Sequence, residues 1–171
     1  MTLFVLFQGY ETQKYRVVEQ LGKVEIRYYP PAMKVKTKGR TSKNNNFNTL
    51  FRYISGHNVK KEKIAMTTPV YIFSEGDTEV MEFVLPSKYK GEAPAAVAAN
   101  TEVYESAEGY YAAISFGGYA NASKVKTYTQ ELLKALRVAG KSLVGKPQLL
   151  SYDAPFKFYN RRNEMLVEIK K

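Results

Sequence analysis

The chain has 171 residues, 44% of them hydrophobic and 25% charged, which is typical of one globular domain with a buried core. It has no cysteine and one histidine, which excludes disulfides, a thiol nucleophile and the usual zinc sites, so an enzyme would need carboxylate, lysine or tyrosine chemistry. The net charge of +10 suggests an anionic partner, but no helix-turn-helix, RNA-binding or zinc-finger pattern is present, and we expect no nucleic-acid partner.

The first residues are apolar but do not predict a membrane segment. The stretch "LFVLF", Leu3 to Phe7, is far shorter than the roughly 18 residues of a spanning helix, and it lacks the flanks of a secretory signal. We expect a soluble, cytoplasmic protein without a transmembrane segment, and no oligomeric state is predicted. The motif "LFVLFQG" is similar to a viral protease recognition sequence used in expression vectors. Residues 1–13 are therefore interpreted as an N-terminal extension, either native or partly vector-derived.

Three strands are predicted next, in "YRVVEQ", "KVEIRYY" and "AMKVKTKG". Pro30-Pro31 separates the second from the third, because proline has no N–H for the ladder. In the third segment basic residues alternate with Met33, Val35 and Thr37, which is the period of a strand with one wet face. We expect its basic side to be solvated, namely Lys34, Lys36, Lys38 and Arg40.

A first helix is predicted in "NNNFNTLFRYIS". Its apolar residues are spaced at i, i+3, i+4 and i+7, as on one face of a helix: Phe47, Leu50, Phe51 and Ile54. Asn44 to Asn46 are N-cap candidates, and Gly56 is placed to end the helix. The single histidine, His57, follows directly.

The segments "KIAMTTPVYIF" and "EVMEFVLP" predict a hairpin with "SEGDT" as its turn. Along the first strand Met66 shares a face with Ile64, which we expect to point inward. In the second strand Glu82 shares a face with Val80 and Val84.

After a connector rich in alanine and proline, the second half repeats this order. Two strands are predicted around Glu108-Gly109, then a helix capped by Asn121 or Ser123 and stopped by Gly140, then two closing strands. We expect an α+β fold made of duplicated β-β-α-β-β units, in a twisted, mostly antiparallel eight-stranded barrel with two helices. Residues 14–171 would form a single domain with pseudo-repeats at about 14–86 and 101–171.

Several motifs resemble, in order and spacing, the SOUL heme-binding protein family. They are "KYRVVEQLGKVEIRYYPP", "FNTLFRYISGHNVKKEKIAMTTPVYI", "MEFVLPSKY" and "FYNRRNEMLVEI". The most specific pattern is F..LF.YI.G.N....KI.MT.PV, and the resemblance covers about Lys14 to Lys171. It implies a distorted eight-stranded barrel with two helices in duplicated arrangement, and binding of heme or another tetrapyrrole without a defined reaction.

From these residues we expect a heme carrier with an apolar groove and weak or no axial ligation. The candidate binding residues are Phe47, Phe51, Ile54, Ile64, Met66 and Val70 for the ring, with Lys60 and Lys63 for the propionates. His57 and Met66 are possible iron ligands by residue type. His57 lies near a helix end, where a cation is also stabilised by the dipole, and the family pattern does not require histidine there.

The alternative is a module like the GyrI effector-binding domains, whose fold the SOUL family resembles. Such domains bind bulky, often cationic organic molecules in the groove between their halves, and some hydrolyse them with a carboxylate. In this chain Glu82 would be the counter-ion or general base and the tyrosines would line the groove, provided that Glu82 faces the groove and not bulk solvent. A binding protein is favoured over an enzyme.

Overall fold

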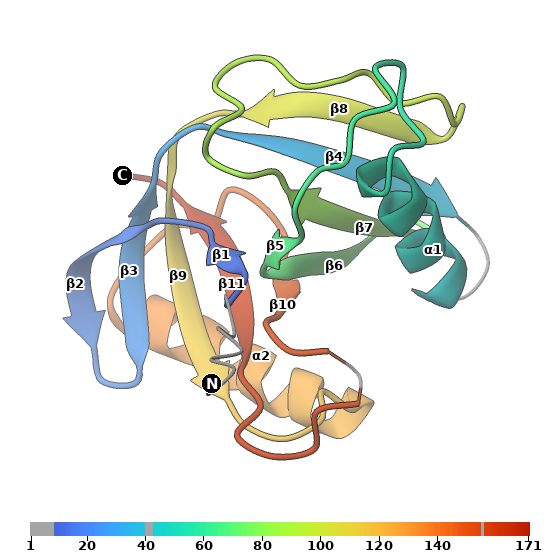
Figure 1. The fold of residues 1–171 in the computed structure, drawn as a ribbon. Coiled ribbons are helices and arrows are strands. Elements are labelled where there is room, and N and C mark those ends of the chain that lie inside the picture. The colour runs from blue at the N-terminus through green and yellow to red at the C-terminus, as the bar shows by residue number, and fades with distance from the viewer. Residues whose placement is uncertain (1–8, 40–42, 155) are drawn as a thin grey trace, which may run out of the picture.

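The computed structural model describes residues 9–39, 43–154 and 156–171 (Figure 1). Most of the "LFVLFQG" motif lies outside the described residues. The helices are α1 (Lys43–Ile54) and α2 (Ala122–Val138). The strands are β1 (Glu11–Thr12), β2 (Arg16–Leu21), β3 (Val24–Tyr29), β4 (Ala32–Gly39), β5 (Thr67–Thr68), β6 (Val70–Glu75), β7 (Thr78–Val84), β8 (Thr101–Ser106), β9 (Gly109–Phe116), β10 (Gln148–Ser151) and β11 (Asn163–Ile169).

Nine of these strands form one antiparallel sheet in the order β2-β3-β9-β11-β10-β6-β7-β4-β8. The sheet curls into a half-barrel, with α1 packed on β4 and β7 and α2 packed on β9 and β11 (Figure 1). A separate parallel pair joins β1 to β5. The predicted α+β class, the two helices and the curled antiparallel sheet are confirmed, and the sheet has nine strands with β2 and β8 as its edges.

The second helix follows its sequence signals closely. Asn121 is the N-cap, and its side chain accepts a hydrogen bond from the backbone N–H of Lys124 at 2.9 Å. Leu132 and Leu136 are buried against the sheet. Gly140, just after the C-terminus, has a φ of +67°, a backbone conformation that glycine adopts without strain.

The first helix differs from its prediction at the N-terminus. It begins at Lys43, so the predicted N-caps at 44–46 are wrong, and the true cap position is outside the described residues. Asn46 instead lies inside the helix, where it is buried and its Nδ2 donates to the backbone oxygen of Glu79 at 3.2 Å. Gly56, with a φ of +109°, lies just beyond the C-terminus as expected.

The predicted continuous strand over 63–73 is also wrong. Residues 61–66 have no regular structure, β5 covers only two residues, and β6 starts at Val70 after Pro69. Proline supplies no N–H to a ladder, which explains the interruption.

Three apolar clusters hold the fold together. One packs α2 on the sheet through Leu132 and Leu136, and one packs α1 on the sheet through Leu50 and Ile54. The third lies on the sheet face turned away from the helices and is rich in tyrosine. Its members are Tyr29, Tyr71, Val84, Ala113, Leu150 and Leu166, with Tyr15, Tyr111 and Tyr152 packed against them.

The basic side of β4 is only partly solvated. Lys38 is exposed, but Lys36 is half-buried and Lys34 is 7% exposed, so the expectation of a solvated face is wrong for Lys34. The reason is the curl of the sheet, which turns this face of the strand inward. Arg40 lies outside the described residues.

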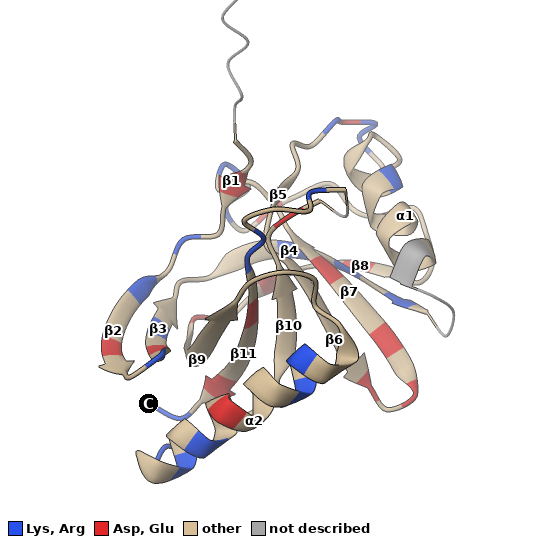
Figure 2. Cartoon of the chain, turned by 90° about the horizontal axis from the view of Figure 1, so that it is seen from below, with Lys and Arg blue, Asp and Glu red and all other residues tan. Residues whose placement is uncertain are grey.

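Elsewhere lysine and arginine are spread over several elements, including α2 (Figure 2). Neither helix, among the described residues, is long and apolar enough to cross a membrane.

Candidate ligand-binding site

A largely apolar cavity of about 650 Å³ lies beside α1. Phe47 and Phe51 line it from the helix, with their rings stacked 5.9 Å apart, while Met66, before β5, and Val70, the first residue of β6, also line it. The volume is within the usual range for a small-molecule site. The other lining residues are Tyr10, Asn48, Thr68, Ile72, Met81, Ser151, Tyr152, Asp153, Ala154 and Phe156.

The structure brings together four of the residues predicted for the heme ring, Phe47, Phe51, Met66 and Val70. Ile54 and Ile64 are 4% and 5% exposed and belong to the core that packs α1 on the sheet, so they do not line the cavity. They belong to the buried cluster against which the cavity residues Phe47, Met66 and Val70 pack.

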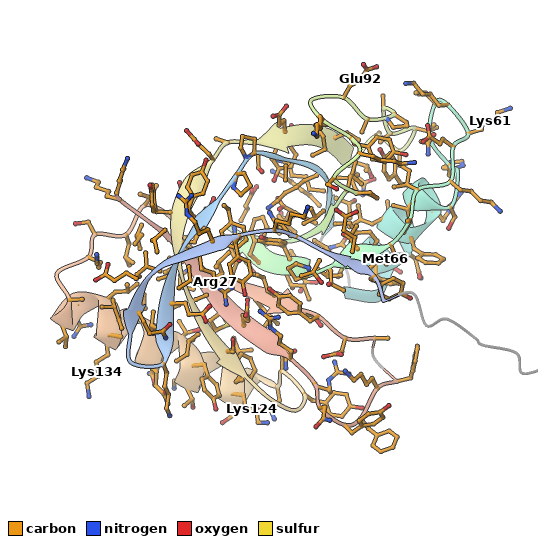
Figure 3. All side chains as sticks on the ribbon, turned by 60° about the vertical axis from the view of Figure 1, so that its left-hand side comes forward. Arg27, Lys61, Met66, Glu92, Lys124 and Lys134 are labelled. Carbon is orange, nitrogen blue, oxygen red and sulfur yellow. The ribbon has the colours of Figure 1, made fainter. Side chains whose placement is uncertain are left out.

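The predicted propionate ligands lie elsewhere. Lys60 and Lys63 are exposed in the loop after α1, where Nζ of Lys60 is 3.6 Å from Glu92. Figure 3 shows Lys61 and Glu92 projecting from loops at the edge of the molecule, with Met66 nearer its centre. Among the described residues that line the cavity, none is lysine or arginine.

His57 is exposed, and its backbone N–H donates to the backbone oxygen of Arg52 at 3.0 Å at the end of α1. It does not line the cavity. Across the described ranges no three His, Cys, Asp or Glu side chains group so as to hold a metal ion. The cavity-lining groups of the types that commonly ligate heme iron are the Met66 sulfur and the phenols of Tyr10 and Tyr152.

The surroundings of Tyr152 disfavour its use as an iron ligand. Its hydroxyl donates to Glu164 at 2.8 Å. Burial and the charge of Glu164 both raise the pKa of Tyr152 well above its usual value, which disfavours the phenolate that ligates iron.

A second cavity, of about 290 Å³, lies on the tyrosine-rich inner face of the sheet. We call it the inner groove. It is lined by Gln13, Tyr29, Lys34, Tyr71, Glu82, Tyr104, Glu105, Ser106, Ala107, Glu108, Tyr111, Gly145, Lys146, Gln148 and Glu168. Glu82 is 4% exposed and faces this groove, so its side chain is not in bulk solvent.

Glu82 has two polar partners in the inner groove. Nζ of Lys34 donates to its Oε2 at 3.2 Å, and the hydroxyl of Tyr104 donates to its Oε1 at 2.7 Å. The Lys34 ammonium also lies 3.7 Å from the centre of the Tyr71 ring. Burial lowers the pKa of Lys34, and the charge of Glu82 offsets this only in part.

A buried ion-pair network lies nearby on the same sheet face. Arg27 donates to Glu164 through two nitrogens, at 2.7 and 2.8 Å, and Arg162 donates to the same carboxylate at 2.7 Å. Ser115 and Tyr152 complete its hydrogen bonds. In Figure 3 Arg27 lies among the strands at the centre of the molecule. Arg27 also pairs with Glu25, so two guanidinium groups meet two carboxylates and the network is structural in character.

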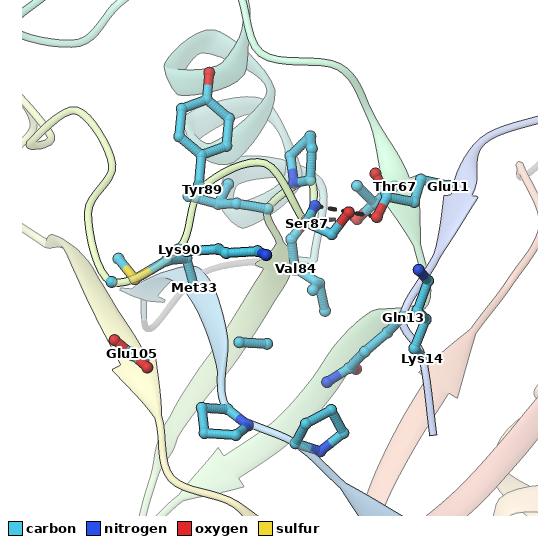
Figure 4. Close-up of a pocket in the computed structure, with 16 residues that line it drawn as sticks. Glu11, Gln13, Lys14, Met33, Thr67, Val84, Ser87, Tyr89, Lys90 and Glu105 are labelled. Carbon is cyan, nitrogen blue, oxygen red and sulfur yellow. Dashed lines mark hydrogen bonds between the residues drawn. The ribbon is translucent and has the colours of Figure 1, made fainter. Parts of the chain in front are cut away.

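A third cavity, of about 370 Å³, lies between the N-terminal strand and the segment after β7 (Figure 4). Its floor is apolar, with Pro30, Pro31, Met33 and Leu85. One wall is closed by a hydrogen bond from the backbone N–H of Ser87 to Glu11 at 3.0 Å.

The family model of the SOUL heme-binding protein matches residues 10–168. The chain belongs to the SOUL family. It is 31% identical to human heme-binding protein 2 over 92% of this chain and 85% of that protein. It is 29% identical to bovine heme-binding protein 1 over 68% of this chain and 64% of that protein.

Solved structures show that the SOUL chain shares its fold with distant proteins. A hydrolase from Listeria innocua matches with a TM-score of 0.62 at 10% identity, over 86% of this chain and 92% of that one. The C-terminal domain of EcmrR matches with a TM-score of 0.59 at 12% identity, over 92% of this chain and 98% of that one. At such identities the likeness concerns the fold alone.

In this SOUL chain, sequence reasoning missed the cavity residues contributed by the C-terminal half. Tyr152, Asp153 and Phe156 line the apolar cavity although about a hundred residues separate them from α1. The run "YDAPFKFY" offered a signal, since a proline within a run of aromatic residues argues against a regular strand, and Phe156 and Phe158 are exposed.

Proposed function

We propose that this protein binds heme or another flat tetrapyrrole in the apolar cavity, with weak or no axial ligation, and acts as a carrier. The observation that carries the proposal is an apolar cavity lined by the stacked Phe47 and Phe51 rings together with Met66 and Val70, in a member of the SOUL family. Relatives named heme-binding protein 1 and 2 support it.

The lining residues fit a flat, mostly apolar ring. Aromatic side chains favour offset stacking on a flat ligand, and burial of the ring between them removes apolar area from water. The polar groups of Asn48, Thr68 and Ser151 are available to the acid groups at the edge of a tetrapyrrole. Bound heme would supply an iron centre, and this chain would contribute the slot and its hydrogen bonds. The roles of Lys60 and Lys63 in binding the propionates remain predictions.

Titration with hemin tests the proposal. We expect a saturable shift of the Soret band at micromolar concentration, weakened at least tenfold by Phe51→Ala, because that ring forms the wall of the slot. Phe158→Ala is the matched control, since Phe158 is 78% exposed and does not line the cavity. No saturable shift, or equal loss of affinity in both variants, contradicts the proposal.

Two further variants test ligation. Met66→Leu removes the sulfur at similar volume, and His57→Ala removes the imidazole. With weak or no axial ligation, both leave the Soret maximum of the complex unchanged. A shifted maximum in one of them identifies that residue as an iron ligand.

The fold supports a second candidate function. We infer it from the burial of Glu82 in the inner groove among tyrosines, which suits a module that binds or hydrolyses a bulky organic compound. Because the groove holds only about 290 Å³ as it stands, this function requires it to widen, and rhodamine 6G, a bulky cationic dye, tests whether it does. Saturable fluorescence anisotropy that is lost in Glu82→Gln supports this function, and absence of binding to the folded wild type dismisses it.

We also propose that residues 14–171 form one domain with two pseudo-repeats, at about 14–86 and 101–171. The strand order supports this, because β7, β4 and β8 follow on one side of the central β6–β10 pair and β11, β9 and β3 follow on the other. In register, Glu82 pairs with Tyr71 and Glu164 pairs with Leu150, so each half has a buried glutamate at a corresponding position.

A further inference from the structure

Lys34 differs from the other basic residues of β4 in being buried at the wall of a cavity. Its side chain is 9% exposed and lines the inner groove. Four strands position the surrounding groups, with Lys34 on β4, Glu82 on β7, Tyr104 on β8 and Tyr71 on β6.

A buried ion pair is weak evidence for stability, because the cost of removing both charges from water offsets most of their attraction. An apolar pair of similar volume would serve packing as well. Desolvation of a lysine that opens onto a cavity favours its free, nucleophilic amine. A carboxylate within hydrogen-bond reach is placed to accept the proton that the amine must lose.

We propose that the inner groove is a carbonyl-binding site in which Nζ of Lys34 forms a reversible imine with a small aldehyde or ketone. The Lys34 ammonium first passes a proton to Glu82, 3.2 Å away. The free amine lone pair attacks the carbonyl carbon, the C=O electron pair moves to oxygen, and that oxygen takes one of the two protons of the positively charged nitrogen to give a carbinolamine. Loss of the hydroxyl as water, with loss of the remaining N–H proton, leaves the C=N bond. The sequence needs no oxidant or reductant.

Each neighbour has a defined part in this site. Glu82 holds the proton, and the Tyr104 hydroxyl donates to its other oxygen and so keeps the carboxylate oriented toward Lys34. The Tyr71 ring lies against the ammonium, and burial keeps the pKa of its phenol well above the usual value. The other titratable groups that line the groove are Tyr29, Glu105, Glu108, Tyr111, Lys146 and Glu168.

The size and lining of the groove indicate the class of ligand. About 290 Å³ is at the lower limit of ligand pockets, so a tetrapyrrole is too large for it and a single substituted ring is not. Phenols, amides and carboxylates around it suit a carbonyl compound with several hydroxyl groups. The site does not depend on heme binding, because the inner groove and the apolar cavity share no lining residue.

Reductive trapping tests this inference. The full chain is incubated at neutral pH with pyridoxal, a neutral aldehyde, and sodium cyanoborohydride, and the labelled lysines are mapped by mass spectrometry. We expect Lys34 to be labelled several-fold faster than Lys36, because burial lowers the pKa of Lys34 and so leaves more of its amine uncharged at neutral pH. Lys34→Arg removes this fast phase, and Lys36→Arg, on the same strand, leaves it unchanged.

The pH dependence of the Lys34 labelling rate tests whether Glu82 acts on the amine or only supports the fold. The charge of Glu82 raises the pKa of Lys34, so Glu82→Gln is expected to move the midpoint of Lys34 labelling to lower pH. Mapping of the folded wild type decides the matter even if a variant does not fold. Labelling of Lys34 no faster than Lys36, or an unchanged midpoint in folded Glu82→Gln, overturns the proposal.

Discussion

The Arg27–Glu164 ion pair joins β3 to β11 at the centre of the molecule, and Glu164 is completely buried. Burial alone would raise the pKa of Glu164, but the hydrogen bonds and charges of Arg27 and Arg162 outweigh it and lower that pKa from 4.5 to about 2. The same bonds keep the pKa of Arg27 above its usual value in spite of burial. The pair is therefore fully charged at neutral pH.

This environment predicts an acid-dependent loss of stability. Because the folded-state pKa is depressed, the contribution of Glu164 is complete above pH 4.5 and is lost as the pH falls from 4.5 toward 2. The shift corresponds to about 3 kcal/mol. Urea unfolding of the wild type between pH 7 and pH 2 should show this loss, and Glu164→Gln should lack it and be about 3 kcal/mol less stable at pH 7.

The control for this prediction is Glu92→Gln. Glu92 is exposed and has only a loose contact with Lys60, so its replacement should change the free energy of unfolding by less than about 1 kcal/mol. An equal effect of both substitutions would show that the buried pair has no special role.

The helix α1 has two different functions on two of its faces. Leu50 is completely buried in the core against the sheet, whereas its neighbour Phe51 is 48% exposed and lines the apolar cavity. Stability and ligand binding should therefore be separable within this one helix.

We expect Leu50→Ala to lower the free energy of unfolding by about 2–5 kcal/mol, because it leaves a cavity in a packed core. Phe51→Ala should cost much less stability while weakening hemin binding. Chemical unfolding and hemin titration of the two variants, side by side, check both statements. A reversed order of the two stability effects would mean that α1 packs differently.

The other helix offers a local test of its N-terminus. Replacing Asn121 by alanine removes the hydrogen bond to the backbone N–H of Lys124 and should cost about 1 kcal/mol, whereas Asn121→Ser keeps a capping oxygen and should be nearly neutral. Thermal unfolding measures the difference, and equal midpoints for the two variants would show that the cap is unimportant.

In the whole molecule, the apolar cavity is shared by segments that are far apart in the chain. Phe47 and Phe51 come from α1, and Tyr152 to Ala154 with Phe156 come from the segment between β10 and β11. A bound ligand would touch both segments and so favour the folded state as a unit.

Hemin should therefore raise the midpoint of thermal unfolding. At a free concentration 100 times its Kd, the added stability is about 2.7 kcal/mol for one site. The shift should increase with hemin concentration, be reduced in Phe51→Ala and persist in Phe158→Ala. A shift of the same size in both variants would place the ligand outside the apolar cavity.

Local sequence patterns predicted most of the elements. Apolar spacing identified both helices, Asn121 and Gly140 marked the ends of the second one, and "SEGDT" marked the hairpin turn. The errors were also local: the helix extends N-terminally beyond its asparagines, and Pro69 interrupts a strand that looked continuous. The family, too, was evident from the motifs alone.

Only the tertiary structure decided which polar residues are buried and which segments form the site. The period of a strand separates its two faces, but it does not tell whether the polar face meets water. Curling of the sheet turned Lys34, Glu82, Arg27 and Glu164 inward together, and residues 151–154 and 156 line the apolar cavity with α1. Such contacts join segments that are distant in sequence, and local patterns therefore do not reveal them. The sequence by itself determined the elements and the family. The curl of the sheet determined the cavities and the residues that line them.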